Sequence, residues 1–238
     1  MFYGRMSGAP LELLRAAVER TRVLTQGRPT TGRSHDGADD TVGTFATDSA
    51  LRFDPFPLLA AVHRAGARVV VIGQVAGIMH GSVELTGDLD LLWDGAPAQA
   101  GALAAAFGSL RSRLHDDDGA LLMPGPEAFL LPKVQFESPW VSGDCCTPAL
   151  AWGELPVQDI LDRALTVSHS EGFEVHYLRR ADLIRMRRAA GRPKDLRRAD
   201  ELECGEQEER HVGSSTAMVQ DVMINWPSGR PRGGRDGS

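Results

Sequence analysis

The sequence predicts an α+β fold, in which helices flank a mixed β-sheet and a pair of helices closes the C-terminal end. Segments with helical spacing of apolar residues alternate with short β-branched runs such as Val69–Ile72. Two strand candidates, Lys133–Glu137 and Asp144–Thr147, are joined by a short polar connection, as in a hairpin. A sheet that combines a hairpin with helical crossovers contains both parallel and antiparallel strand pairs, so we expect a mixed sheet.

Length and composition limit the class of protein. With 238 residues, 42% hydrophobic and 24% charged, the chain can bury a core and has an ordinary globular composition. The formal net charge of −6 argues against a general nucleic-acid coat. The three cysteines show no CxxC spacing, which argues against a zinc site or a disulfide framework. No apolar run reaches the roughly 18 residues of a membrane span and the N-terminus lacks an apolar signal core, so we expect a cytoplasmic location and no membrane partner.

Composition also divides the chain into three parts. Residues 1–53 are expected to form a helix over Pro10–Leu24, followed by a flexible linker over Gln26–Ser49, which is rich in Gly, Thr, Asp and Ser. Residues 54–204 alternate helices and strands and form the folded domain. Residues 205–238 are polar and end in SGRPRGGRDGS, which predicts a disordered tail.

Capping and periodicity signals place the elements of the domain. Asp54-Pro55 begins a helix that ends at Gly66. The other expected elements are strands at 67–72, 88–92, 110–114 and 174–178, the hairpin described above, and helices at 75–80, 97–107, 157–165, 181–190 and 193–203.

The strand candidate at 88–92 carries two aspartates, Asp88 and Asp90. Residues i and i+2 of a strand share a face, so the two carboxylates lie side by side while Leu89 and Leu91 face the core. Neighbouring carboxylates repel each other unless a cation lies between them, and Mg²⁺ suits two carboxylates combined with phosphate oxygens. The alternative is an edge strand whose solvent face carries two acids.

Gly73 separates the apolar strand from the short helix that follows it. A glycine in this place lets backbone N–H groups approach a phosphate, and the helix dipole favours the negative charge. An ordinary turn glycine is the alternative.

Together, IGQVAGIMHGS, TGDLDLLW and the closing stretch LRRADLIRMRRAAGRPKDLRRADEL resemble small bacterial AbiEii-like nucleotidyltransferases. These belong to the nucleotidyltransferase superfamily, which has the DNA polymerase β-like fold. The resemblance covers roughly Ala67 to Leu202. It implies a nucleotidyltransferase fold and the metal-dependent transfer of an NMP group from an NTP to an acceptor, with release of pyrophosphate.

The resemblance also implies roles for particular residues. Asp88 and Asp90 would ligate the metal ions that hold the NTP, in a two-metal site for Mg²⁺, with Mn²⁺ as the alternative. Gly73 would lie along the triphosphate, beside Gln74, where the family usually has Gly or Ser. Thr86 matches a threonine often seen before the acidic strand and is expected to belong to the nucleotide site.

A third carboxylate on a neighbouring strand would act as a metal ligand or as a base. We favour Asp144, in SGDCCT, as a catalytic and metal-binding residue; an alignment two residues later would place Cys146 there instead, and a thiol is a poor ligand for Mg²⁺. Lys194, at the start of the last helix, would reach triphosphate oxygens. Arg187 stands where the family often has lysine.

The resemblance suggests a toxin-like role with an antitoxin partner and an acceptor that is RNA, such as tRNA, or protein. Nine Lys or Arg between Arg179 and Arg198 could hold an RNA acceptor. Two alternatives remain open: a catalytically weakened nucleotide-binding module of the same fold, and a small-molecule nucleotidyltransferase of the antibiotic-modifying kind.

Overall fold

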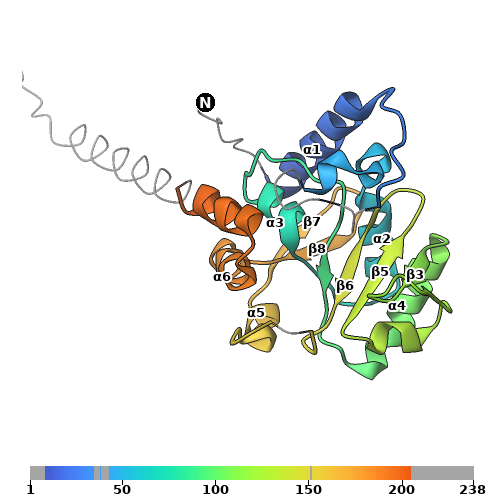
Figure 1. Ribbon diagram of the computed structural model, residues 1–238. Helices are drawn as coiled ribbons and strands as arrows, with labels where there is room; N and C mark the ends of the chain where they lie inside the picture. Colours follow the sequence, from blue (N-terminus) through green and yellow to red (C-terminus); the bar gives the residue numbers. More distant parts are fainter. Residues whose placement is uncertain (1–8, 35–37, 39–42, 151, 205–238) are drawn as a thin grey trace, which may run out of the picture. The chain divides into compact units, whose positions relative to one another are not determined.

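The computed structural model describes residues 9–34, 38, 43–150 and 152–204 (Figure 1). The predicted disordered tail, residues 205–238, lies outside the described residues, as do residues 35–37 and 39–42 of the predicted linker. The contacts divide the chain after Leu202, and the sheet, its helices up to Leu202 and the site described below belong to the first unit, Met1–Leu202.

The described residues form one eight-stranded mixed sheet with the strand order β4-β3-β5-β6-β2-β1-β8-β7. The strands are β1 Val70–Val71, β2 Leu91–Leu92, β3 Arg113–His115, β4 Leu121–Leu122, β5 Lys133–Glu137, β6 Ser142–Cys146, β7 Leu165–Ser168 and β8 Glu174–Tyr177. The pairs β1–β8 and β2–β6 are parallel, and the other neighbouring pairs are antiparallel. The prediction of an α+β fold with a mixed sheet is therefore confirmed.

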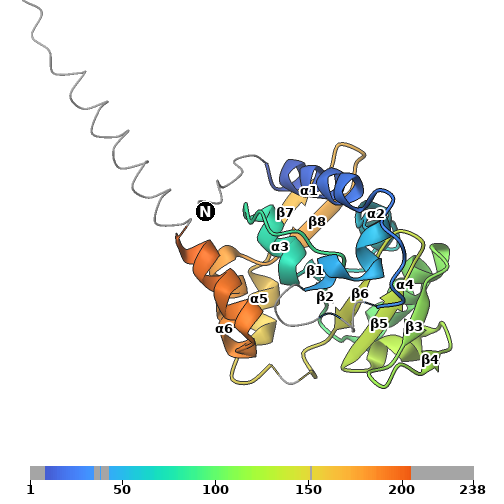
Figure 2. The same cartoon turned by 45° about the horizontal axis from the view of Figure 1, so that its top comes forward.

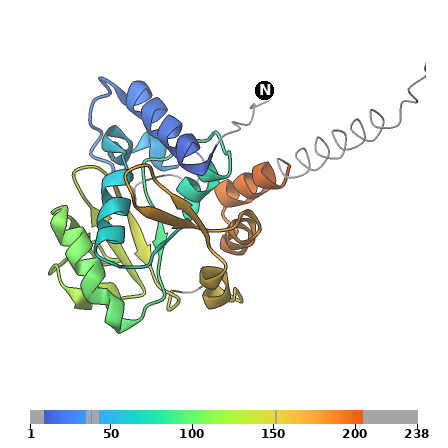
Figure 3. The ribbon, with the colours of Figure 1, turned by 180° about the vertical axis from the view of Figure 1, so that it is seen from behind.

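Helices cover both faces of this sheet. They are α1 Pro10–Thr25, α2 Phe56–Arg64, α3 Gly73–Met79, α4 Pro97–Ser109, α5 Val157–Asp162, α6 Arg180–Ala190 and a helical stretch over residues 193–204. Helices α2 and α4 contact each other on the face seen in Figure 3, whereas α3 contacts both α1 and α6 in Figure 2. Within the described ranges, no helix is both long and apolar enough to cross a membrane.

The central strands are buried on both sides. Val71, Leu91 and Leu92 are fully buried, which is the environment that a strand covered by helices on both faces provides. Phe107 of α4 packs edge-on against Phe136 of β5, with ring centroids 4.9 Å apart. This rigid centre fixes the ends of β1, β2 and β6, from which the site described below is built.

The strands that carry the candidate aspartates differ in their bounds from the sequence predictions. β2 covers only Leu91–Leu92 of the strand expected over 88–92, and Asp88 forms an isolated bridge before it, which agrees with the low preference of aspartate for strands. β6 begins at Ser142 and ends at Cys146, whereas its strand was expected over Asp144–Thr147.

A helix and an edge strand also differ from the sequence predictions. The helix expected over 157–165 ends at Asp162, and Leu165 begins β7, which pairs with β8 in an antiparallel hairpin. The β-branched residues Thr166 and Val167 favour this extended conformation. The short edge strand β4 was not expected at all. By contrast, β5 has the predicted bounds, and α6 ends before Gly191, which adopts a left-handed conformation at φ 67°.

The described part of the predicted linker is packed against the domain. It contains two 3-10 helices, Thr44–Ala46 and Asp48–Arg52. The Asp48 carboxylate accepts hydrogen bonds from the backbone of Thr31 at 2.8 Å and of Gly32 at 2.7 Å. Side-chain-to-backbone bonds thus order a segment that has few apolar residues, which explains why its composition suggested a linker.

Helix α1 also belongs to the packed unit. Leu14 is fully buried, and α1 contacts α3 and the second 3-10 helix. The domain therefore begins well before the boundary at residue 54 that the composition suggested.

Candidate functional site

A cavity of about 540 Å³ lies where the ends of β1 and β2 and the strand β6 meet α6. Its lining combines residues from five parts of the chain: the N-terminal segment around Thr44, the central strands with the segments that join them to α3, the turn between β3 and β4, the loop before α5, and the C-terminal helices. Sequence-distant segments therefore build one concave site.

The three predicted aspartates Asp88, Asp90 and Asp144 all line this cavity and are half-buried. Asp88 bridges Ser142 of β6 in parallel register, and Leu91 pairs with Cys145 in the same register. This common register places Asp90, which directly precedes β2, opposite Asp144 of β6. The structure thus brings together the carboxylates that the sequence analysis grouped.

The strand β6 presents both candidates for the third position, because Asp144 and Cys146 are two residues apart and both line the cavity. Burial, and then the negative charges of Asp144 and Asp90, raise the pKa of the Cys146 thiol well above its usual value. The thiol therefore stays protonated at neutral pH and is a poor partner for Mg²⁺. Asp144 is the oxygen donor of the two.

The donor set suits a hard cation, since carboxylate oxygens are the ligands that Mg²⁺ prefers. Among the residues that the structure describes, no group of three or more His, Cys, Asp or Glu could hold a metal ion. Mg²⁺ is usually held by one or two carboxylates together with substrate phosphates and water. The residues present fit a metal ion whose coordination is completed by a phosphate-bearing substrate.

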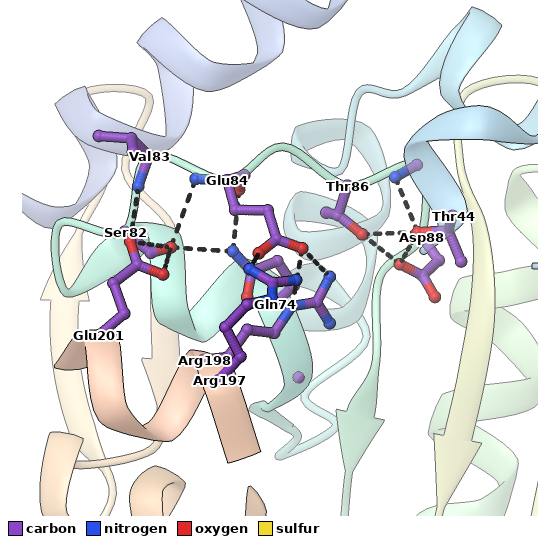
Figure 4. A network of polar contacts seen from close by, with 12 residues as sticks. Thr44, Gln74, Ser82, Val83, Glu84, Thr86, Asp88, Arg197, Arg198 and Glu201 are labelled. Carbon is purple, nitrogen blue, oxygen red and sulfur yellow. Dashed lines mark hydrogen bonds and ion pairs between the residues drawn. The ribbon is translucent and has the colours of Figure 1, made fainter. Parts of the chain in front are cut away.

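Two hydroxyl groups orient Asp88 (Figure 4). The Thr44 hydroxyl donates to Oδ1 of Asp88 at 2.7 Å, and Thr86 donates to the same oxygen. Thr86, predicted to belong to the nucleotide site, is buried and does not line the cavity, so its contact is with Asp88. Thr44 was missed by the sequence analysis because nothing in the local sequence links it to a strand that lies far along the chain.

Gly73 lies directly against Asp90. Its φ of 61° is in the left-handed region, and an added β-carbon would lie 1.9 Å from Oδ2 of Asp90. Gly73 therefore permits both the turn into α3 and the approach of the carboxylate to the backbone.

Gln74 points into the protein interior, where its side chain is fully engaged. Its amide nitrogen donates to the Ser82 hydroxyl at 3.0 Å and to the Glu84 carbonyl at 2.8 Å, and its oxygen accepts a hydrogen bond from Arg187 at 2.8 Å. The residue expected beside a triphosphate thus contributes to the wall of the cavity and not to an open binding loop.

Arg187 links α6 to the glycine turn. Besides Gln74, its guanidinium donates to the carbonyl of Gly73 at 3.2 Å and to that of Arg198 at 2.9 Å. Burial, and then repulsion from Arg198, lower the pKa of Arg187 to about 10, so it remains charged at neutral pH. An added β-carbon at Gly77 would lie 2.5 Å from this guanidinium, which explains the second glycine of α3.

The basic C-terminal segment is compensated locally. All its arginines contact carboxylate or carbonyl oxygens; examples are Arg192 with Asp195 at 2.5 Å and Arg197 with Glu84 at 2.6 Å. Lys194, expected to reach triphosphate oxygens, is half-buried and lines the cavity from the first turn of the helical stretch 193–204.

The cavity also contains an ion pair that the sequence did not predict. Lys133 of β5 contacts Asp117 at 2.5 Å, and both residues line the cavity. The acidic run at 116–118 resembles a solvated turn, and Asp116 indeed caps that turn by accepting the N–H groups of Asp118 and Ala120. Only the register of β5 against β6 reveals that Lys133 shares the cavity.

The remaining wall is apolar. Trp152, Leu155, Leu183 and Met186 form it, and the Trp152 indole is held by a 2.8 Å hydrogen bond to the carbonyl of Thr147. The cavity lining therefore combines acidic, basic and apolar side chains.

Comparison with models of known protein families gave no match to this chain, and comparison with curated proteins gave none either. The functional assignment therefore depends on the geometry of the cavity and on the sequence motifs that meet there.

Proposed function

We propose that this protein is a metal-dependent nucleotidyltransferase, which moves an NMP group from an NTP to an acceptor and releases pyrophosphate. The observation that supports it is that Asp88 and Asp90, just before β2, and Asp144 of the neighbouring β6 line one cavity beside the Gly73 turn. Carboxylates that line one cavity repel each other unless a counter-charge is present, and a divalent ion with a triphosphate would supply one.

The chemistry is an in-line displacement at the α-phosphorus. The acceptor oxygen forms a bond to this phosphorus while the bond to the pyrophosphate oxygen breaks. Asp88 and Asp90 would hold Mg²⁺ or Mn²⁺, which polarises the phosphorus centre and stabilises the attacking and leaving oxygens. Asp144 would complete this ligand set or accept the proton of the acceptor hydroxyl.

Other groups of the cavity position the substrate. Lys194 would contact the triphosphate from the C-terminal helix, where a lysine acts as a point charge for phosphate oxygens. Thr44 and Thr86 hold one oxygen of Asp88, which leaves Oδ2 for the cation. Preorganised carboxylates of this kind lower the cost of binding the metal–substrate complex.

The acceptor class follows from the resemblance to AbiEii-like proteins: RNA such as tRNA, or a protein, in a toxin-like role opposed by an antitoxin. The local pairing of the arginines weakens the case for a long polynucleotide, since phosphate binding needs available positive charge. A protein hydroxyl fits the cavity better on this ground.

Label transfer tests the proposal. The purified chain is incubated with Mg²⁺ or Mn²⁺, each of four α-labelled NTPs, and either total tRNA or cell protein. We expect metal-dependent labelling of one acceptor, abolished by Asp90→Asn and retained by Asp159→Asn, an exposed aspartate of α5 outside the cavity. Absence of both labelling and metal-dependent NTP binding would overturn the proposal.

A nucleotide-binding module without transfer activity is the second candidate. Two observations favour it: no described group of three or more ligands is arranged to hold a metal ion, and Gln74 is locked in the interior. In that case equilibrium titration would show Mg²⁺-dependent NTP binding that Asp90→Asn removes, with no label transfer to any acceptor.

A further inference from the structure

The ion pair between Lys133 and Asp117 stands apart from the motifs used above. Lys133 lies in β5, which pairs antiparallel with β6 so that Lys133 is opposite Cys146 and Gln135 is opposite Asp144. Cross-strand partners share a face of the sheet, so the Lys133 side chain projects to the side that carries Asp144.

The strand order fixes which side of the aspartates Lys133 occupies. The four neighbouring strands are β5, β6, β2 and β1, in that order. Gly73 follows β1 at one end of this series, and Lys133 begins β5 at the other. Asp90, just before β2, and Asp144 of β6 therefore lie between the glycine turn and the lysine, and all four residues line the same cavity.

The partner of Lys133 is easily exchanged. The Asp117 side chain is 58% exposed on the turn between β3 and β4, whereas that of Lys133 is 21% exposed. Ion pairs with an exposed member contribute little to stability, and a phosphate offers a lysine more negative charge than one carboxylate does.

We propose that Lys133 forms an anion subsite for a phosphate group, on the side of the aspartates away from Gly73, with Asp117 as its counter-ion when the subsite is empty. The inference rests on the proposed function, because it uses the same cavity, but it concerns binding alone. A phosphate there belongs either to the nucleotide or to the acceptor.

The two members of the ion pair give opposite predictions. Lys133→Met removes the charge that binds the anion, so we expect binding of inorganic pyrophosphate in the presence of Mg²⁺ to weaken roughly tenfold. Asp117→Asn removes the competing carboxylate, so the same binding should tighten, by roughly two- to fivefold. A purely structural ion pair would instead move both variants in the same direction. Isothermal titration calorimetry measures the pyrophosphate affinity of each variant, and thermal unfolding verifies that each variant is folded.

Matched variants complete the design. Lys133→Arg keeps the charge and should retain most of the binding. Arg113→Met breaks the ion pair between Arg113 and Glu137 at the other end of β5, outside the cavity lining, and should leave anion binding unchanged. If Lys133→Met and Asp117→Asn change the affinity for pyrophosphate in the same direction, or if neither changes it, the proposed subsite is wrong.

A competition arm identifies the source of the phosphate. If a saturating non-hydrolysable NTP abolishes the Lys133-dependent binding, the nucleotide itself occupies the subsite; if that binding persists, an acceptor phosphate does. If the wild-type protein transfers no label but the two variants still change pyrophosphate affinity in opposite directions, the result counts against the proposed transfer reaction only. If label is transferred but the affinities do not change in this way, the result counts against the subsite only.

Discussion

Gly73 and Asp90 are in such close contact that a β-carbon added to the glycine would lie 1.9 Å from Oδ2 of the carboxylate. The turn follows β1 and the acid directly precedes β2, and these two strands pair antiparallel. The backbone N–H of Ile72 strengthens this link, since it donates to the carbonyl of Asp90 at 2.9 Å. The position of the carboxylate is therefore coupled to the shape of the turn.

Gly73→Ala should displace Asp90 and strain the backbone. The left-handed φ alone costs about 1–2 kcal/mol for an alanine, and the steric overlap adds to it. We expect a lower melting temperature and loss of metal-dependent NTP binding. Gly101→Ala is the matched control, because a β-carbon at this exposed position of α4 meets no atom within 4 Å and alanine favours a helix. Equal behaviour of the two variants in thermal unfolding and NTP titration would contradict the steric role of Gly73.

Thr44→Val should release Asp88. It removes the hydroxyl that donates to Asp88 and accepts the N–H of Gly87 at 3.1 Å, so a buried donor loses its partner at a cost of about 1–3 kcal/mol. We expect lower stability in urea and at least a tenfold loss of label transfer. Thr44→Ser keeps the hydroxyl and should recover most of both. If Thr44→Val transfers label as well as wild type, Thr44 has no positioning role.

Glu84→Gln should destabilise the protein in a pH-dependent way. Burial alone would raise the pKa of Glu84, but hydrogen bonds from Arg197 and Arg198 outweigh it and lower the pKa below the ordinary value of 4.5. A lowered folded-state pKa gives stability that is present above pH 4.5 and is lost as the pH falls through the folded-state value. The difference in melting temperature between wild type and Glu84→Gln should therefore be large at pH 7 and shrink toward pH 3. Glu19→Gln, in an exposed ion pair on α1, should show little difference at either pH.

The cysteines should differ sharply in reactivity. Burial raises the pKa of both Cys145 and Cys146, with a smaller contribution from Asp144, whereas Cys204 is exposed. Because the thiolate is the reactive form, iodoacetamide at pH 7.5 should add one group to the native protein and three to the denatured chain, as counted by intact mass. Rapid double or triple modification of the native protein would show that the cavity exposes Cys146.

Local signals in the sequence were sufficient for much of the fold. Pro97 and Pro193 each begin a helix, Gly191 ends α6, and the alternation in β5 gave its bounds, because each of these patterns acts over a few residues. Their spacing also grouped Asp88 and Asp90, which both line the cavity although β2 begins only at Leu91.

These local signals do not predict contacts between segments that are far apart in the sequence. Thr44 reaches Asp88 through side-chain hydrogen bonds in a segment without apolar periodicity, and Lys133 meets Asp117 only because β3, β5 and β6 are neighbours. The interior position of Gln74 likewise depends on Arg187, which lies far along the chain. Tertiary pairing, not local propensity, decides these positions.

The cavity that unites Thr44 with Arg198 has a consequence for biosynthesis. A ribosome makes the acidic strands long before it releases the helical stretch that supplies Lys194 and Arg198, so a nascent chain carries unbalanced carboxylates until translation has passed these residues. Premature termination before that point would leave Arg187 without the carbonyl of Arg198 and Glu84 without its two arginines. The protein therefore acquires a complete site only as its synthesis nears the end of the first unit.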